Sequence, residues 1–224
     1  MRCCWASTSP ATCSTDGCRN CWRRWRPGGD PMFHVNHPEP GAEIHYRDPF
    51  ATAPDQRSPA RRLRGRLAAP VTLWTAVDPA DGTPAGLTVS STVLADGEPA
   101  RLIGLLDEES DLWEVLRESR RFTVAPLGPA HRQLADRFAG LMPAPGGPFT
   151  GVDWQDTPYG PVHPQVTSWA GCRLDDARPY GWSMLVEATV ESVTVTEQPD
   201  PGPLLHYRGR YRELTGPSGP AAGS

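Results

Sequence analysis

The chain of 224 residues is long enough for one large domain or two small ones, and its 22 basic residues are all arginine. Because lysine is missing, a Schiff base to pyridoxal phosphate, a phosphate-loop lysine and the lysine of protein kinases are excluded. With 26 acidic residues the net charge is −4, which gives nucleic-acid binding no electrostatic support.

Residues 1–31 differ in composition from the rest, because they hold five of the six cysteines and no Leu, Ile, Val or Phe. The pattern C-x4-C-x2-C that begins at Cys13 occurs in iron–sulfur loops, with Cys3 or Cys4 as a fourth ligand, and its last two cysteines suit zinc. We favour another interpretation, in which this segment is a non-native or disordered extension and translation starts at Met32. No metal site is therefore predicted.

Neither a signal peptide nor a membrane span is predicted. Residues 1–31 lack an apolar run, and the longest such run, residues 67–77, has about half of the twenty residues that a span requires. A single cysteine after residue 31, Cys172, indicates a reducing, cytoplasmic location. Residues 32–60 read as a proline-rich lead-in, whose His34, His37 and His45 we interpret as surface side chains rather than metal ligands.

The next part of the chain predicts three strands joined by tight turns. An apolar, β-branched run over 69–77 reads as a buried strand. Turn signals at Asp81-Gly82 and Asp96-Gly97 bound a second strand over 85–94, and 100–106 follows as a third.

Two helices and further strands follow. Ser110 is a good N-cap for a helix that ends at Ser119, and 122–127 returns as a strand. Pro129 suits the first turn of a second helix. The buried stripe of this second helix is predicted to consist of Leu134, Phe138 and Leu141.

The last third of the chain again reads as strands. After an irregular stretch, 168–174 is a short strand, and 184–190 alternates with period two until the phase shifts beyond Ser192, which suggests a β-bulge. A final strand covers 204–211, and 215–224 is predicted to be a disordered tail. The sequence therefore predicts a mainly β domain, a β-barrel with helical inserts.

The usual catalytic signatures are missing, because the sequence has no G-x-S-x-G elbow, no H-E-x-x-H pair and no G-x-G-x-x-G fingerprint. Four acids surround the start of the first helix, where they complement the helix dipole. These acids are Asp107, Glu108, Glu109 and Asp111. The run 86–91 (GLTVSS) is more informative, since small hydroxyl residues and successive backbone N–H groups hold a phosphate without lysine.

In order along the chain, several segments resemble the flavin reductase-like, FMN-binding split-barrel family. The resemblance covers about residues 61–214, and the ordered series is more specific than any single segment. The segments are PVTLWTA at 70–76, GLTVSS at 86–91, the helix from Ser110, QLADRFAG at 133–140, F-x-G-x-x-W at 149–154, WAGC at 169–172 and PLLHYRGRY at 203–211.

This resemblance implies an FMN site made of three parts. Relatives hold the flavin with a strand end that matches Thr88, Val89, Ser90 and Ser91. Residues that match Leu106, Asp107 and Ser110, just before the first helix, complete the site, and those that match Arg137 and Phe138 lie close to the flavin.

The resemblance also implies an activity. Family members are usually homodimers that transfer hydride from NAD(P)H to the flavin, and the reduced flavin often leaves to serve a monooxygenase. FMN is the expected cofactor, with FAD or riboflavin as alternatives. No acid–base pair is needed for this chemistry, so no catalytic residue is predicted among the side chains. A non-catalytic flavin-binding or interaction module of the same fold is the alternative function.

Two departures from the family pattern bear on the site. Where many relatives carry a polar residue or a proline pair, this chain has Glu98-Pro99-Ala100-Arg101. Where relatives often carry Gly-Asp-His, this chain has Gly181-Trp182-Ser183. Trp182 is therefore the candidate on the nicotinamide side, with a buried core aromatic as the alternative. The four acids would repel a phosphate unless an arginine intervenes, and the candidates are Arg120, Arg121 and Arg137.

Overall fold

A computed structural model describes residues 58–196 and 202–214, which all belong to one unit, Thr52–Ser224. The cysteine-rich segment 1–31, the lead-in up to residue 57 and the tail 215–224 lie outside the described residues. The domain boundaries and the interpretations offered for those segments therefore stay predictions.

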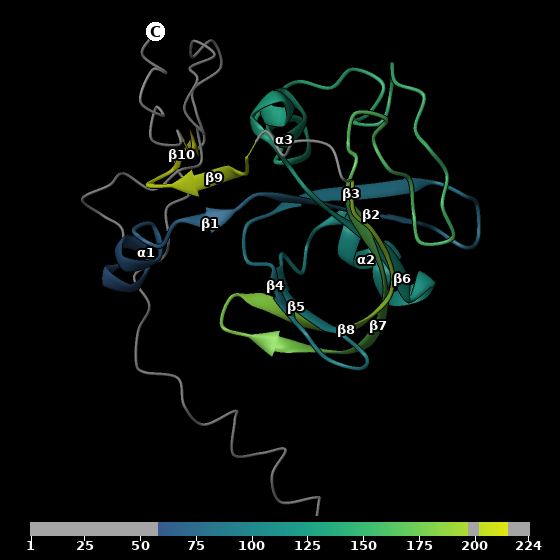
Figure 1. Ribbon diagram of the computed structural model, residues 1–224, viewed down its shortest axis with the longest axis horizontal. Coiled ribbons are helices and arrows are strands. Elements are labelled where there is room, and N and C mark those ends of the chain that lie inside the picture. Colours follow the sequence, from purple (N-terminus) through teal and green to yellow (C-terminus); the bar gives the residue numbers. More distant parts are fainter. Residues whose placement is uncertain (1–57, 197–201, 215–224) are drawn as a thin grey trace, which may run out of the picture. The chain divides into compact units, whose positions relative to one another are not determined.

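A curved sheet of seven antiparallel strands, in the order β3-β2-β6-β7-β8-β5-β4, forms the body of the domain (Figure 1). This architecture confirms the predicted mainly β fold with helical inserts. The strands are β2 (Thr72–Val77), β3 (Pro84–Val89), β4 (Val93–Ala95), β5 (Arg101–Leu106), β6 (Arg121–Pro126), β7 (Trp169–Tyr180) and β8 (Ser183–Thr194).

Alternation of side chains sets the two faces of the sheet. In β5, Leu102 and Leu106 are buried, whereas Ile103 between them is exposed. The predicted bulge is confirmed in β8, where Gly171 of β7 faces Ser192 and the next residue faces Val190, so one residue of β8 is left over. The predicted strand 168–174 is longer in the structure, because β7 continues to Tyr180 as a hairpin with β8.

Helix α2 (Asp111–Ser119) covers the concave side of the sheet (Figure 1). The Ser110 hydroxyl accepts from the backbone N–H of Trp113 at 3.3 Å, which confirms the predicted N-cap. Leu112 and Leu116, one helical turn apart, are fully buried in the same cluster as Trp74 of β2. Burial of this stripe holds the helix inside the barrel.

The prediction of one strand over 85–94 is wrong, because the chain leaves the sheet at residues 90–92 between β3 and β4. Side chains explain the break. The Ser91 hydroxyl accepts from the N–H of Leu105 and donates to the carbonyl of the same residue, both at 2.9 Å. The Thr92 hydroxyl bonds to that of Thr72 at 2.7 Å. Hydrogen bonds from the Ser91 and Thr92 side chains thus connect this segment to β5 and β2, where backbone hydrogen bonds between strands would otherwise continue.

Helix α3 (Arg132–Phe138) follows a short 3-10 turn, η2 (Pro129–His131). Leu134 and Phe138 are buried as predicted, but Leu141 is 53% exposed, so its assignment to the stripe is wrong. The helix ends at Phe138, and Gly140 at φ +70° turns the chain before Leu141 can continue the helical phase.

A second, three-stranded sheet has the order β1-β9-β10 and lies beside helix α1 (Pro59–Arg64). Its strands are β1 (Ala69–Pro70), β9 (Leu204–Tyr207) and β10 (Arg210–Glu213). The single strand predicted over 204–211 is wrong, because Arg208 and Gly209, both at positive φ, turn the chain into a hairpin. The predicted strand 69–77 is likewise divided at Val71 into β1 and β2.

Candidate functional site

Thr88 and Phe138, predicted site residues on the α3 side of β3, are used in contacts that pack α3 against β3. Thr88 donates its hydroxyl to the Ala135 carbonyl at 2.8 Å, which fastens α3 to β3. Phe138 is buried with its ring edge-on to Phe149, and a Cβ added to Gly86 would lie 2.7 Å from the Phe138 ring. Only glycine allows this approach, so Phe138 is part of a wall rather than an open contact surface.

Arg137 is the neighbour of Phe138 in α3, and its guanidinium donates to the carbonyl of Thr150 at 3.4 Å. This long hydrogen bond holds the side chain loosely against the loop that follows α3. The Thr88 and Phe138 contacts place Arg137 at the edge of the same wall.

Val89 ends β3 and Leu106 ends β5, and both are buried in the core cluster that contains α2. They can offer a ligand only their backbone groups. The Asp107 carboxylate accepts from the N–H of Glu109 at 3.1 Å, and the Asp107 carbonyl accepts from the Ser110 hydroxyl at 2.7 Å. These bonds stiffen the turn into α2, while the Asp107 side chain stays exposed.

The hydroxyls of 88–92 divide into those with partners and one without. Thr88, Ser91 and Thr92 are used by α3, β5 and β2 respectively. The described residues provide no hydrogen-bond partner for the half-buried Ser90. Of the predicted hydroxyl contacts, Ser90 is therefore the one with its full bonding capacity left.

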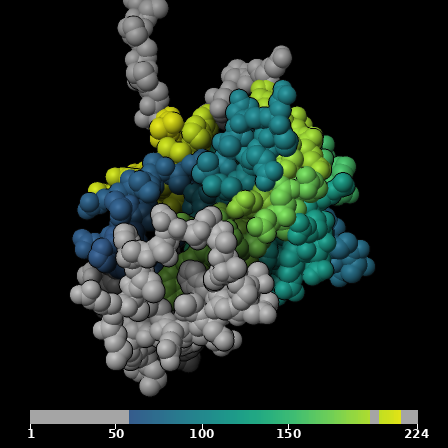
Figure 2. Space-filling view, turned by 90° about the horizontal axis from the view of Figure 1, so that it is seen from below, coloured from purple at the N-terminus to yellow at the C-terminus, as the bar shows by residue number. Residues whose placement is uncertain are grey.

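An open cavity of about 280 Å³ lies over the outer face of β5 and the β7–β8 hairpin. Its floor is apolar, and one sequence-predicted residue, Ser91, lines it. The lining residues are Ser91, Ile103, Gly104, Leu105, Arg178, Tyr180 and Leu185. In the space-filling view of Figure 2, the teal β4–β5 segment adjoins the green β7–β8 segment.

The register of the hairpin explains how these side chains meet. Leu105 of β5 faces Leu185 of β8, which in turn faces Arg178 of β7. The Arg178 guanidinium lies 5.8 Å from the centre of the Tyr180 ring and 3.6 Å from the Glu187 carboxylate. A flat ring fits this arrangement, because it can lie on the apolar floor while its polar edge faces the guanidinium.

Trp182 stands at the tip of the β7–β8 hairpin, and its side chain is 95% exposed. The alternative of a core aromatic is therefore wrong. Gly181 at φ +64° makes the tight turn that leaves the indole outside the sheet. One residue, Gly181, separates Trp182 from Tyr180 of the cavity, so the tip places a second aromatic ring near the same opening.

The three arginines suggested as counter-charges lie elsewhere. Arg120 donates to the Asp175 carbonyl at 2.9 Å, and Arg121 lies over the Tyr159 ring. The arginine at the cavity is Arg178, which the sequence analysis did not select. The predicted strand ends at residue 174, so the prediction does not include Arg178 or place it against the apolar floor of the cavity. An irregularity between Leu174 and Asp176 shifts the phase of β7, so a period-two pattern gives no signal for Arg178.

Other reactive groups in the described residues are shielded. Cys172 is a free, buried thiol, and burial together with the Glu191 charge raises its pKa to about 12. The thiol therefore stays protonated and is no nucleophile.

Within 58–196 and 202–214, no group of three or more His, Cys, Asp or Glu side chains is placed to hold a metal ion. In the same residues, no helix has the length and apolarity to cross a membrane.

Known structures define the class of fold. The chain is similar to a nitrilotriacetate monooxygenase component B homologue from Mycobacterium thermoresistibile, at 26% identity and a TM-score of 0.63. The similarity covers 70% of this chain and 85% of that structure. The curved antiparallel sheet with few helices is a split barrel of the flavin reductase type.

The sequence gives the more specific assignment. The family described as flavin reductase like domain matches residues 64–215, more than half of the chain. The protein belongs to this family and is an oxidoreductase of the flavin reductase class. The expected resemblance is thereby confirmed.

Two curated relatives extend the comparison. One is the flavin-dependent monooxygenase reductase subunit HsaB of Mycobacterium tuberculosis, 27% identical over 152 residues, which cover 67% of this chain and 79% of the relative. The other is the reductase component of the FADH(2)-dependent resorcinol hydroxylase of Rhizobium sp. strain MTP-10005. It is 30% identical over 152 residues, 67% of this chain and 83% of the relative.

Proposed function

We propose that this protein is an NAD(P)H-dependent flavin reductase that supplies reduced flavin to a monooxygenase. The family match over 64–215 carries the proposal, and the names of the relatives, which are reductase components of monooxygenase systems, support the partner. FMN is the preferred flavin of the proposal, with FAD as the alternative. A cytoplasmic location suits a user of nicotinamide nucleotides.

The cavity on β5 and the β7–β8 hairpin fits a flavin in chemical character. When bound, the flavin supplies the redox chemistry by accepting hydride from a nicotinamide. Ile103, Leu105 and Leu185 would support the flat ring and exclude water from one side. Arg178 would bind electronegative oxygens at the polar edge, where its charge favours added electron density.

The segment 88–91 and the turn 106–110 would hold the rest of the cofactor. Ser90 offers a hydroxyl without a partner among the described residues, and the backbone of Val89 and Leu106 lies at the ends of β3 and β5. Thr88 and Phe138 act indirectly in this proposal, because they position β3 against α3. Trp182 would stack on the nicotinamide side.

We also propose a homodimer. Val93, Leu94 and Ile103 are exposed apolar side chains on β4 and β5, next to the cavity, together with Tyr180 and Trp182 of the hairpin. A second copy placed there would bury these side chains and cover the open side of the cavity. A sheet edge as exposed as β4 also gains from such cover.

One titration and one assay test the function. Purified full-length protein is titrated with FMN and with FAD, and NADH and NADPH oxidation is then followed with the better flavin. We expect flavin binding and flavin-dependent oxidation of one nucleotide. Binding without oxidation would favour the non-catalytic module, and a failure to bind either flavin would contradict the proposal.

A pair of serine variants tests the site. Ser90→Ala removes a hydroxyl that has no partner in the described residues, so flavin affinity should fall by about ten- to a hundredfold while stability stays unchanged. Ser91→Ala should behave differently, because it removes both hydrogen bonds to Leu105 and should lower the melting temperature. Unchanged affinity in Ser90→Ala would remove Ser90 from the site.

A further inference from the structure

Arginine side chains gather where α1 and the small sheet meet. We define the arginine face as Arg62, Arg64, Arg66, Arg208, Arg210 and Arg212. The two segments are joined by a hydrogen bond from the Arg208 N–H to the Gly65 carbonyl at 2.8 Å and by pairing of β1 with β9. Figure 2 shows the blue α1–β1 segment beside the yellow β9–β10 segment.

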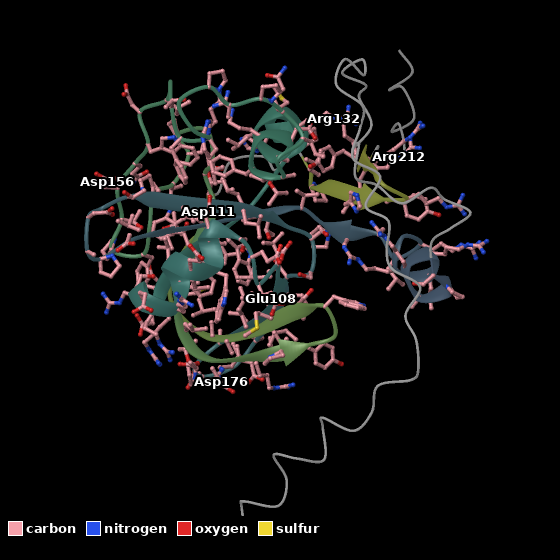
Figure 3. The ribbon with its side chains drawn as sticks, turned by 180° about the vertical axis from the view of Figure 1, so that it is seen from behind. Glu108, Asp111, Arg132, Asp156, Asp176 and Arg212 are labelled. Carbon is pink, nitrogen blue, oxygen red and sulfur yellow. The ribbon has the colours of Figure 1, made fainter. Side chains whose placement is uncertain are left out.

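The face is basic in an otherwise acidic protein. Residues 58–70 and 202–214 carry seven arginines and one acid, Glu213, whereas the other described residues carry eight arginines and seventeen acids. In Figure 3, the labelled Arg212 lies by nitrogen-tipped side chains near α1, while the labelled Asp111, Glu108 and Asp176 lie over the large sheet. Charge is therefore separated between two sides of the unit.

Arginines outside the arginine face form ion pairs with acidic side chains. Arg101 pairs with Asp175 at 3.1 Å, and Arg173 pairs with Glu191 at 2.8 Å. Among ion pairs between described residues, none includes an arginine of the arginine face. The positive charge of the arginine face acts on His206 in β9. The pKa of His206 is lowered by burial and, to a smaller extent, by the Arg64 charge. Like charges held close together repel one another, and a partner of opposite charge would relieve this repulsion.

Apolar and aromatic side chains accompany the arginines. Leu63 and Leu67 of the first segment and Leu214 of the second are exposed. The Arg208 guanidinium lies 5.4 Å from the centre of the Tyr207 ring. Arginine, tyrosine and exposed leucine in one patch are typical of a protein–protein interface, in which arginine forks bind carboxylates.

We propose that the arginine face docks an acidic surface of a partner protein. Carboxylates of a protein surface match the planar guanidinium forks, and the tyrosine and leucines beside the arginines suit the apolar part of a protein–protein interface. At physiological salt the field is screened beyond about 8 Å, so a local patch can attract a local partner surface. The face shares no residue with the cavity, so this proposal and the reductase proposal can fail separately.

The test uses poly-L-glutamate as the acidic polypeptide, added to the full-length protein and followed by fluorescence anisotropy. We expect binding at about 50 mM salt that is lost at about 500 mM salt, because the attraction is screened. Arg210→Gln/Arg212→Gln should weaken binding about fivefold, and Arg210→Lys/Arg212→Lys less than that. The control Arg117→Gln removes an exposed arginine of α2, whose ion pair is to the adjacent Glu118, and should leave binding unchanged.

Several results would overturn the proposal. One is that Arg210→Gln/Arg212→Gln binds poly-L-glutamate as tightly as the wild type does. Another is that Arg117→Gln weakens binding as much as this double variant does. Tighter binding of oligo-dT or of vesicles containing phosphatidylserine than of poly-L-glutamate would assign the face to nucleic acid or membrane instead. If Arg210→Gln/Arg212→Gln fails to fold, Arg62→Gln/Arg66→Gln replaces it, because it removes the same charge from the other segment of the arginine face. Its binding to poly-L-glutamate is then compared with that of the wild type.

Discussion

The α3 side of β3 and the outer face of β5 lie close together in sequence but have opposite characters. On the α3 side, Thr88 is bonded to Ala135 and Phe138 is packed against Gly86, so the surface is closed. On the outer face, Tyr180 and Trp182 are exposed beside an open cavity. The candidate residues therefore divide into those that build a wall, such as Phe138, and those that present a surface, such as Trp182.

The largest effect is expected on the closed side. Phe138→Ala should lower the free energy of unfolding by about 3–5 kcal/mol, because it leaves a cavity between Gly86, Phe149 and Trp154. Leu141→Ala, just after the same helix, is the matched control and should change it by less than about 0.5 kcal/mol. Urea unfolding measures both. Similar small losses in the two variants would show that the α3 side is not a wall.

Gly86→Ala tests the same contact from the other partner. The added Cβ would lie 2.7 Å from the Phe138 ring, which is buried and cannot move freely, so we expect a loss of about 1–3 kcal/mol in unfolding free energy. Gly65→Ala is the control, since its nearest contact would be the Arg61 carbonyl at an ordinary 3.6 Å. Equal stability of the two variants would contradict the close packing of β3 on α3.

The sequence predicted local features well where a short pattern determines them. The Ser110 cap, the end of α2 at Ser119 and the β8 bulge depend on residues that are neighbours in sequence. The break at residues 90–92 escaped prediction, because it depends on bonds from Ser91 to Leu105 of another strand. Long-range pairing of this kind is not encoded in a local period.

The same reason limits the candidate site. Family resemblance selected the segment 88–91, and the structure places Ser91 on the cavity. It did not select Arg178 or Leu185, which reach the cavity only through the register of β5, β8 and β7. Phe138 was selected by its place in a motif, although packing against Gly86 leaves it little surface for a ligand.

On the open side, Trp182 should affect kinetics and not stability. Trp182→Ala should lower kcat or raise the KM for the nucleotide by about tenfold, a loss of about 1.4 kcal/mol of stacking energy. Trp182→His should change nucleotide kinetics with flavin affinity nearly unchanged. Because the side chain is 95% exposed, the unfolding free energy should stay within about 0.5 kcal/mol of the wild type.

Leu141→Ala again serves as the control, because it removes an exposed apolar side chain outside the hairpin. Normal nucleotide kinetics in Trp182→Ala, or a large loss of stability, would contradict a role for the indole at the cavity opening.

The smallest effect is a pH dependence on the closed side. His163 is buried against Trp154, and burial, followed by the charges of His131 and Arg137, lowers its pKa below the usual 6.5. The unfolded chain therefore binds a proton at a higher pH than the folded protein does. Above pH 6.5 both states are neutral at this residue and its contribution is fully present; as pH falls below 6.5 the unfolded state gains protons and stability is lost.

The slope from one histidine is at most about 1.4 kcal/mol per pH unit, and His131 adds to it because its pKa is lowered by burial as well. Urea unfolding at a series of pH values below 6.5 should show a shallower slope in His163→Phe than in the wild type. The phenyl ring keeps the edge-on contact with Trp154, so a loss of stability at neutral pH is separated from the change in slope. Equal slopes would mean that His163 accepts its proton as readily in the folded protein as in the unfolded chain, and that this side of the barrel is wetter than its packing indicates.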